Sequence, residues 1–323
     1  IYLNGQKAAD THYGYSENRI ELTPFLEYGE ENVIEVYICH EDCPDSRWYT
    51  GAGIYRPVTL EVLDRVYILP DGVRIQTISL DPVQILIQAE YYGEEMQIQI
   101  LKDAEIVAEG EMKGHSLILD IPNAACWSAE SPSLYQCRLL LLHQGKMADN
   151  QNIIFGIRML EWGSNGLYIN GVNTLLRGGC LHSDNGILGA CSYKESEWRR
   201  IKLLKEAGFN AVRSSHNPCS RSMLDACDYY GMYVIDETWD MWYKHKNPYD
   251  YAEEFMEHYK EDLQSMVQKD FNHPSVIAYS IGNEISEPSS EIGMELAAEM
   301  KAFLNFHDKM RPVTAGINLM IIA

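Results

Sequence analysis

Residues 276–284 read Val-Ile-Ala-Tyr-Ser-Ile-Gly-Asn-Glu, an apolar run that ends in an amide and a carboxylate. The part from 276 to 281 is short, apolar and preceded by Pro274, which is typical of a strand buried on both faces of a parallel sheet. Barrel enzymes carry their chemistry at the C-terminal ends of such strands. Burial there can raise the pKa of Glu284 so that it donates a proton, and the amide of Asn283 can hold a substrate hydroxyl. The structural alternative is that Glu284 caps the next helix or pairs with an arginine.

The sequence around this strand alternates strands with helices. It predicts five strands, at 174–181, 210–215, 233–236, 276–281 and 312–316, and four helices, at 193–207, 220–230, 253–270 and 291–305. Such alternation indicates a parallel sheet, and a closed (β/α)8 barrel needs eight of each element. We therefore expect the first half of a TIM barrel, in a natural polypeptide that continues beyond residue 323. The open sheet edges of half a barrel also predict pairing with a second copy, as a homo-oligomer.

The residues before this stretch form a succession of short predicted strands. One group lies at 1–3, 20–22, 33–38 and 54–62, with Asn4-Gly5 as a hairpin turn. A second group lies at 73–78, 84–89, 96–100, 117–121 and 134–139. Strands at this spacing, with turn residues and no helices between them, fit β-sandwiches. We place boundaries near Asp64 and Gly156, which gives the segments 1–64, 65–156 and 157–323.

The 323 residues include 26 basic and 47 acidic side chains, a formal net charge of −21. This charge argues against nucleic acid or an anionic membrane as a partner, since both need basic patches, and it weakly favours a neutral substrate. No apolar run approaches the ~20 residues that span a bilayer. Eight cysteines are spread along the chain, so we expect reduced thiols and a cytoplasmic location. A metal site at Cys39, His40 and Cys43 is set aside, because no second ligand cluster accompanies it.

Polar clusters follow four of the predicted strands. They include His182, Arg213 in the run Arg-Ser-Ser-His-Asn-Pro, Asp236, and Asn283. Each could be structural alone, and a lone histidine more often is. Four clusters at equivalent strand ends are harder to dismiss, because that face of a barrel is where loops build a pocket. Trp239 fits either the core or a surface that stacks on sugar rings.

Three motifs, in this order and spacing, resemble glycoside hydrolase family 2. They are RSSHNP at 213–218, Asp236-Glu237, and IGNE at 281–284. The run SRWYTGAGIYRPV at 46–58 resembles the end of the family's N-terminal jelly-roll domain, and FGIR at 155–158 resembles the start of its barrel. The resemblance spans almost the whole chain, and the family includes β-galactosidases, β-glucuronidases and β-mannosidases.

This resemblance implies a fold for each segment. It implies the C-terminal part of a jelly-roll domain over 1–64 and an immunoglobulin-like β-sandwich over 65–156. Residues 157–323 would be the N-terminal half of a TIM barrel. The family's members are retaining glycosidases, so the implied activity is hydrolysis of terminal β-linked sugars.

The same resemblance assigns roles to residues at the strand ends. Glu284 is expected to be the general acid/base, and Asn283 to hold the sugar 2-hydroxyl. The other expected substrate-site residues are Arg213, which would orient the carboxylates, His182, His216, Trp239, and Asp45 from the first domain. The family's nucleophile glutamate follows the seventh barrel strand. We therefore expect it beyond residue 323, and expect these residues alone not to turn over a glycoside.

The sequence leaves more than one alternative for the sugar that is hydrolysed. Residues 181–190 and 247–251 look like those of bacterial β-galactosidases, which makes a β-linked galactoside the leading substrate. β-Glucuronidase is the alternative, and its Asn-x-Lys pair for the sugar carboxylate would lie past residue 323. A mannoside-cleaving enzyme and, in another class, a non-catalytic carbohydrate-binding protein stay open. No cofactor is expected, and Mg²⁺ or Na⁺ near the site stays open, since no complete ligand set is visible.

Overall fold

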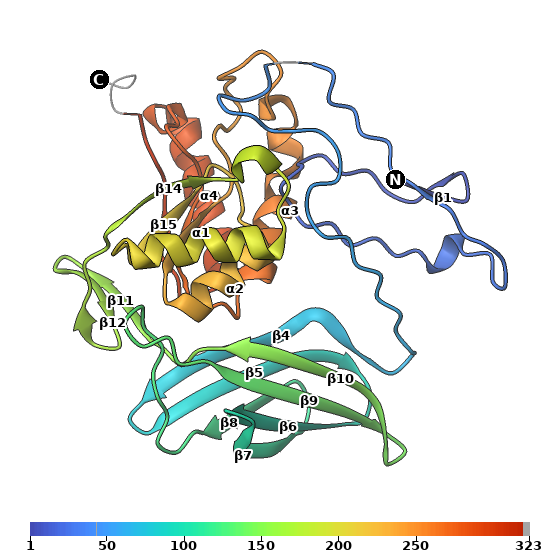
Figure 1. The fold of residues 1–323 in the computed structure, drawn as a ribbon, viewed down its shortest axis with the longest axis vertical. Helices are drawn as coiled ribbons and strands as arrows, with labels where there is room; N and C mark the ends of the chain where they lie inside the picture. The colour runs from blue at the N-terminus through green and yellow to red at the C-terminus, as the bar shows by residue number, and fades with distance from the viewer. Residues whose placement is uncertain (43, 319–323) are drawn as a thin grey trace.

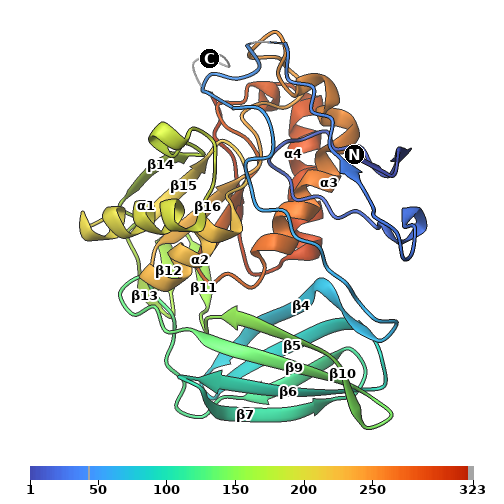
Figure 2. The same cartoon turned by 45° about the vertical axis from the view of Figure 1, so that its right-hand side comes forward.

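The computed structural model describes residues 1–42 and 44–318, which form three parts (Figure 1). A long segment with little regular structure leads into a β-sandwich, and the sandwich leads into an α/β part. The N-terminal segment runs beside helix α3 (Ala252–Asp270) of the α/β part (Figure 2). No helix within the described residues is long and apolar enough to cross a bilayer. The cysteines of the described chain are free thiols.

Residues 1–64 form three short strands and long connections. The strands are β1 (Tyr2–Leu3), β2 (Gln6–Lys7) and β3 (Ile34–Glu35), in the sheet order β2-β1-β3. The predicted hairpin turn is confirmed, since Asn4-Gly5 joins β1 to β2 with positive φ at both residues. The strands predicted at 20–22 and 54–62 are wrong. Residues 54–62 alternate like a strand, but no other strand of the described chain pairs with them to complete a ladder. A single-turn 3-10 helix, η1, follows the first of these stretches at Thr23–Phe25.

Residues 67–155 form a β-sandwich of two antiparallel sheets (Figure 1). One sheet has the strand order β10-β9-β6-β7, and the other has the order β4-β5-β8. Alternate side chains, such as Ile85 and Ile87 on β5 and Ile98 and Ile100 on β6, fill the core between the sheets. The bounds are β4 Tyr67–Leu80, β5 Val83–Tyr92, β6 Glu95–Lys102, β7 Glu105–Met112, β8 Ser116–Asp120, β9 Tyr135–His143 and β10 Lys146–Phe155.

The sequence pattern does not predict two of these strands, β7 and β10. Both lie at the edges of the four-stranded sheet, and most of their residues, apolar ones included, are exposed or partly exposed. Edge strands tolerate polar and charged residues, which also discourage pairing with other chains. In β7, Gly110 lies close beneath the other sheet, where a Cβ would meet Leu119 Cδ2 at 2.9 Å. Hydrophobic alternation is therefore weak in these two edge strands.

A buried arginine joins the sandwich to the α/β part. Arg158 Nε and Nη2 each donate at 2.5 Å, to the carbonyls of Pro274 and Val276, where strand β17 (Val276–Ser280) begins. Burial lowers the pKa of Arg158 to about 9. Three short antiparallel strands follow the arginine: β11 Leu160–Gly163, β12 Gly166–Ile169 and β13 Val172–Asn173. Together with Trp127 they cover the N-terminal ends of the barrel strands.

The α/β part contains a five-stranded parallel sheet in the order β14-β15-β16-β17-β18. Each strand and helix predicted here overlaps an observed one. Helix α2, for example, begins where Ser220 Oγ accepts from Met223 N and ends at Gly231, whose φ is 75°. The remaining bounds are β14 Gly178–His182, η2 Gly186–Leu188, α1 Lys194–Glu206, β15 Ala211–Ser215, α2 Arg221–Tyr230, β16 Tyr233–Glu237, η3 Glu287–Ser289, α4 Glu291–His307 and β18 Val313–Thr314.

Lys269 of α3 is buried together with two aspartates, Asp236 of β16 and its neighbour Asp270. Its Nζ donates to Asp236 Oδ2 at 3.0 Å and also to Asp270 Oδ1. Burial, with the negative charge of Asp236, raises the pKa of Asp270 to about 8 against the attraction of Lys269. The shared ammonium group therefore ties α3 to β16 from inside the fold.

Replacing Lys269 with methionine is expected to destabilise the chain by about 3–5 kcal/mol, because the buried Asp236 carboxylate loses its cation and Asp270 loses a hydrogen-bond donor. Urea unfolding, followed by the fluorescence of the buried Trp239 and Trp242, measures the change. Lys260→Met on the same helix is the matched control, since its ion pair with Glu299 is exposed and should matter little. Equal shifts of the unfolding midpoint in the two variants would contradict the account.

Candidate active site

The C-terminal ends of strands β14 to β17 bring the predicted polar residues together. In the parallel pairing, His182 stands opposite Ser215, and Glu237 stands opposite Ser280. Because these strands run in one direction, the residues that follow them emerge on the same face of the sheet. Asn283 follows β17 on this face and contacts the side chains of Arg213, within β15, and Asp240, just after β16. Polar residues predicted at separate strand ends therefore belong to one site, namely His182, Arg213, His216 and Asn283. Asp236 is the exception, because its side chain contacts Lys269 and Cys219 instead.

Glu237, the last residue of β16, is the buried centre of this site. Its Oε2 accepts from Arg213 Nε at 3.0 Å, from Arg213 Nη2 at 2.5 Å and from Ser280 Oγ at 2.5 Å. Its Oε1 lies 2.6 Å from His216 Nδ1. A buried carboxylate is tolerated where donors of this kind surround it. Glu237 therefore fixes two of the predicted site residues, Arg213 and His216, in place.

Asn283 is held at both ends of its amide. Its Oδ1 accepts from Arg213 Nη2 at 3.0 Å, and its Nδ2 donates to Asp240 Oδ1 at 2.7 Å. These partners set the orientation of the buried amide, because one is a donor and the other an acceptor. An asparagine amide nitrogen carries two hydrogens. The second hydrogen is the group that would meet a sugar hydroxyl.

Asp240, just after β16, is a second buried carboxylate. Arg47 Nε and Nη2 donate to its two oxygens at 3.1 and 2.6 Å, and Lys246 Nζ donates at 3.1 Å. Burial opposes ionisation, but the hydrogen bonds from Arg47 and Asn283 and the charge of Lys246 hold the pKa of Asp240 below its ordinary value. Arg47 comes from the N-terminal segment, so two distant parts of the chain meet at this carboxylate.

Glu284 follows the strand end in an uncommon backbone conformation, with φ of 44°. Non-glycine residues rarely adopt positive φ, and such positions are concentrated at functional sites. The next residue is fixed by a hydrogen bond from Ile285 N to Gly316 O at 2.9 Å. The Glu284 side chain is 54% exposed, and its Oε2 accepts from Arg47 Nη1 at 2.7 Å. The carboxylate is thus presented at the surface of the site.

The expected rise in the pKa of Glu284 is wrong for this structure. The hydrogen bond and the charge of Arg47 lower the pKa of Glu284 instead, and burial is a smaller, opposing effect. This is the arginine pairing that the sequence leaves open as a structural alternative. It favours the charged form of the carboxylate before any substrate binds.

Three rings, those of His182, His216 and Trp48, form a wall of the site. The centroid of Trp48 lies 5.2 Å from that of His182 and 5.6 Å from that of His216, and the two imidazoles are 5.3 Å apart. Burial and the neighbouring His216 lower the pKa of His182, which favours its neutral form at pH 7. His182 Nδ1 is buried without a partner among the described residues. The imidazole of His182 and the indole of Trp48 suit the hydroxyls and the apolar face of a sugar.

Among the predicted site residues, Trp239 lies in the core, and Asp45 bonds within its own loop. Trp239 is fully buried, packs against Phe255 and donates from Nε1 to Asp262 Oδ2 at 3.1 Å. Its predicted stacking role is corrected to a core role, because its ring offers no free face to a sugar. Asp45 accepts from Thr50 Oγ1 at 3.1 and 3.2 Å, within its own loop. That loop reaches the site through its following residues instead.

Sequence reasoning missed Arg47, Trp48, Asp240 and Lys246 as site residues. Arg47 and Trp48 belong to the run 46–58, which marks the end of a domain in the sequence and gives no chemical signal by itself. Asp240 lies in the polar run after a predicted strand, so its position was a usable signal. Lys246 is one lysine in a loop, and its proximity to Asp240 comes from tertiary packing alone.

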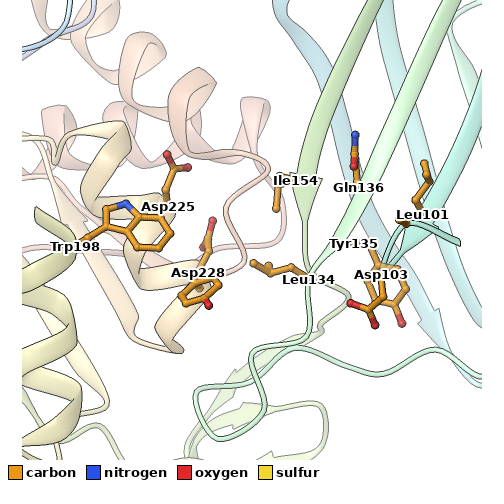
Figure 3. Close-up of a pocket in the computed structure, with 11 residues that line it drawn as sticks. Leu101, Asp103, Leu134, Tyr135, Gln136, Ile154, Trp198, Asp225 and Asp228 are labelled. Atoms are coloured by element: carbon orange, nitrogen blue, oxygen red, sulfur yellow. The ribbon is translucent and has the colours of Figure 1, made fainter. Parts of the chain in front are cut away.

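The pocket drawn in Figure 3 is a separate feature. It lies between the sandwich and helices α1 and α2, with Trp198 and Asp225 on the helices and Leu101 and Tyr135 on the sandwich. None of the site residues predicted from the sequence lines it. The contacts at the strand ends, and not this pocket, define the candidate active site.

Comparison with known proteins identifies the family. The profile of "Glycosyl hydrolases family 2" matches residues 73–158, and that of "Glycosyl hydrolases family 2, TIM barrel domain" matches residues 161–320. The chain is 33% identical to a Bacteroides ovatus protein named a β-galactosidase, over 98% of this chain and 43% of that protein.

Two solved structures show the same relationship. A glycosyl hydrolase family 2 member from Bacteroides cellulosilyticus superposes with a TM-score of 0.92 at 36% identity, covering 98% of this chain and 43% of that one. A β-glucuronidase from Ruminococcus gnavus superposes with a TM-score of 0.70 at 25% identity, covering 78% of this chain and 43% of that one.

This chain belongs to glycoside hydrolase family 2. The family recognised from the motifs and the fold expected from it are confirmed. The chain spans 43% of the length of each of these three relatives. Their names include both a β-galactosidase and a β-glucuronidase, so the comparisons leave the sugar open.

Arg47 is expected to control the charge state of Glu284. Arg47→Met should raise the pKa of Glu284, because it removes the hydrogen bond and the positive charge that favour the carboxylate. In the wild type, Glu284 is protonated and the ion pair is lost as the pH falls through this pKa. In the variant, which has no ion pair, the protonation of Glu284 should occur at higher pH. A titration followed by NMR of carbon-labelled glutamate carboxyls measures the pKa, and Glu284→Gln assigns the resonance.

Two further variants make this test specific. Arg47→Lys keeps the charge and loses the planar guanidinium, so the pKa of Glu284 should lie between the values of the other two proteins. Arg19→Met in the same segment is the matched control, since Arg19 pairs with Glu61 and Asp71. A pKa of Glu284 that is equal in Arg47→Met and the wild type would show that the pairing is unimportant.

Proposed function

We propose that this chain is part of a retaining β-glycosidase that hydrolyses terminal β-linked sugars, with β-galactosides as the leading substrates. Retaining glycosidases use two carboxyl groups ~5–5.5 Å apart, one as acid/base and one as nucleophile. The observation that supports the proposal most is the pair Asn283 and Glu284 at the end of β17. The first has a fixed amide, and the second presents its carboxylate at the surface of the site.

In this proposal Glu284 is the general acid/base. It gives a proton to the leaving oxygen and later takes one from the attacking water. Its ion pair with Arg47 favours the charged form, which suits the second step. For the first step Glu284 must be protonated. An aglycone that draws Arg47 away would raise the pKa of Glu284 and permit this protonation.

The other groups bind and position the sugar. Asn283 holds the 2-hydroxyl, and Arg213 acts through it, because its guanidinium donates to the Asn283 oxygen. Glu237 and Asp240 are assigned as positioning residues, since both are buried and bound to cations. The nucleophile stays assigned, by family resemblance, to a glutamate beyond residue 323.

The cations at the site favour a neutral sugar over a uronic acid. Arg213 is paired with Glu237. The two cations Arg47 and Lys246 are matched by two carboxylates, because both pair with Asp240 and Arg47 also pairs with Glu284. A uronate carboxylate needs a cation whose charge is not already matched. Among the described residues, these three offer no such cation. This observation favours β-galactosidase over the alternative, β-glucuronidase.

The protein encoded by the full reading frame that contains this sequence is expected to hydrolyse a nitrophenyl β-galactoside more efficiently than the matching β-glucuronide. The ratio of kcat/KM should be at least about tenfold, or about 1.4 kcal/mol, since like charges placed together at a binding site are strongly unfavourable. Initial rates over a range of both substrates measure the ratio.

The other outcomes select the alternatives. A higher kcat/KM for the glucuronide would overturn the sugar assignment in favour of β-glucuronidase. Sugar binding without hydrolysis of any β-glycoside would contradict the proposed enzymatic activity and favour a non-catalytic carbohydrate-binding protein. The cytoplasmic location and the homo-oligomer stay predictions of the sequence.

A further inference from the structure

A second cluster of ionisable side chains lies where the N-terminal segment meets helix α3. Glu254 and His258 are one helical turn apart on α3, and His12 approaches them from the segment. His12 Nδ1 lies 2.5 Å from Glu254 Oε2, and the rings of His12 and His258 stack with centroids 3.8 Å apart. One ligand atom from each of the three residues lies within 4.8 Å of the other two.

These side chains form a donor set suited to a divalent transition metal. Zinc binds imidazole nitrogen and carboxylate oxygen, and two histidines with one glutamate leave a fourth coordination position open. Residues i and i+4 lie on one face of a helix, so Glu254 and His258 point to the same side. Glu261 Oε2 lies 3.3 Å from His258 Nδ1. A carboxylate on one ring nitrogen commonly orients a histidine whose other nitrogen binds metal.

We propose that His12, Glu254 and His258 bind a divalent cation of the zinc class, with water in the open position. The site is accessible to a hydrated ion, because the side chains of His12 and Glu254 are 38% and 51% exposed. Other exposed His–Glu pairs, such as His143 with Glu94, lack a third ligand of this kind in the described chain.

The bound ion would fasten the N-terminal segment to the α/β part. Hydrogen bonds already hold the same stretch, among them those from Tyr13 Oη to Thr238 O at 2.7 Å and from Ser16 Oγ to Asp262 Oδ1 at 2.6 Å. Strands within the segment are short, so contacts of this kind set its position. The segment also carries Arg47 to the active site. The metal site rests on its own geometry and is independent of the proposed function.

The sequence gives no sign of this cluster, because His12 and Glu254 are 242 positions apart. The stretch that sequence reasoning weighed for a metal was Cys39, His40 and Cys43. Cys43 lies outside the described residues, and no group of ligands forms around the other two in the described chain.

Zinc titration of the purified protein by calorimetry tests the proposal. His12→Ala and Glu254→Gln remove one ligand each, and His143→Ala is the matched control, since its ring faces Glu94 at 3.3 Å and is 41% exposed. The wild type and His143→Ala should bind about one ion per chain, and the two ligand variants should bind at least about tenfold more weakly. Zinc at 100 times its Kd should raise the folded-to-unfolded ratio about 100-fold in the first two proteins alone.

Cobalt substitution separates this site from binding at cysteine thiols. Cobalt held by these nitrogen and oxygen ligands should show visible d–d absorption without sulfur-to-metal charge transfer. Equal zinc affinity in all four proteins, a sulfur charge-transfer band, or no binding would each overturn the proposal. None of these results would bear on the proposed glycosidase, which is assayed separately with sugars.

Discussion

Two buried carboxylates, Glu237 at the end of β16 and Asp240 just after it, impose the arrangement of the site. Each is tolerated in the interior because cations and hydrogen-bond donors surround it. Glu237 holds Arg213, and Asp240 holds Arg47. Asn283 lies between the two networks, with Arg213 on its oxygen and Asp240 on its nitrogen. The Asn283 amide that would contact the sugar is therefore positioned by charged residues, Arg213 and Asp240, to which we assign no step of the reaction.

Arg47 connects the N-terminal segment to the candidate active site. It lies 237 positions before Glu284 in the sequence, yet it pairs with that carboxylate and with Asp240 at once. The pKa of the acid/base candidate is therefore lowered by a residue outside the α/β part. The site is complete only when the N-terminal segment packs against the α/β part and places Arg47 beside Glu284. The contacts of this segment with α3 therefore help to position Arg47.

The sequence predicts the central α/β elements well and the two edge strands of the four-stranded sheet poorly. Strand β17 is a continuous apolar run between turn signals, so its burial on both faces is visible in the pattern. Strands β7 and β10 face solvent at sheet edges, and their polar residues carry no such signal. At the site, residues next to strand ends were found from their position. Arg47 and Lys246 were not, because their contacts depend on how separate segments pack. Trp239 was predicted as a site residue but lies in the core. In sequence, a tryptophan beside carboxylates is equally compatible with a core position and with a surface that stacks on sugars.

The most direct test of the account is kcat/KM of Glu284→Gln, in the full reading frame, for two β-galactosides that differ in leaving group. General acid catalysis contributes about 10²–10⁴-fold, so a loss of that size is predicted when the leaving group is a sugar. The loss should be much smaller for a nitrophenyl leaving group, which departs with little help from a proton. Glu291→Gln, at an exposed position at the start of α4, is the control and should leave both rates unchanged. No loss in Glu284→Gln, or the same loss on both substrates, would contradict the acid/base role of Glu284.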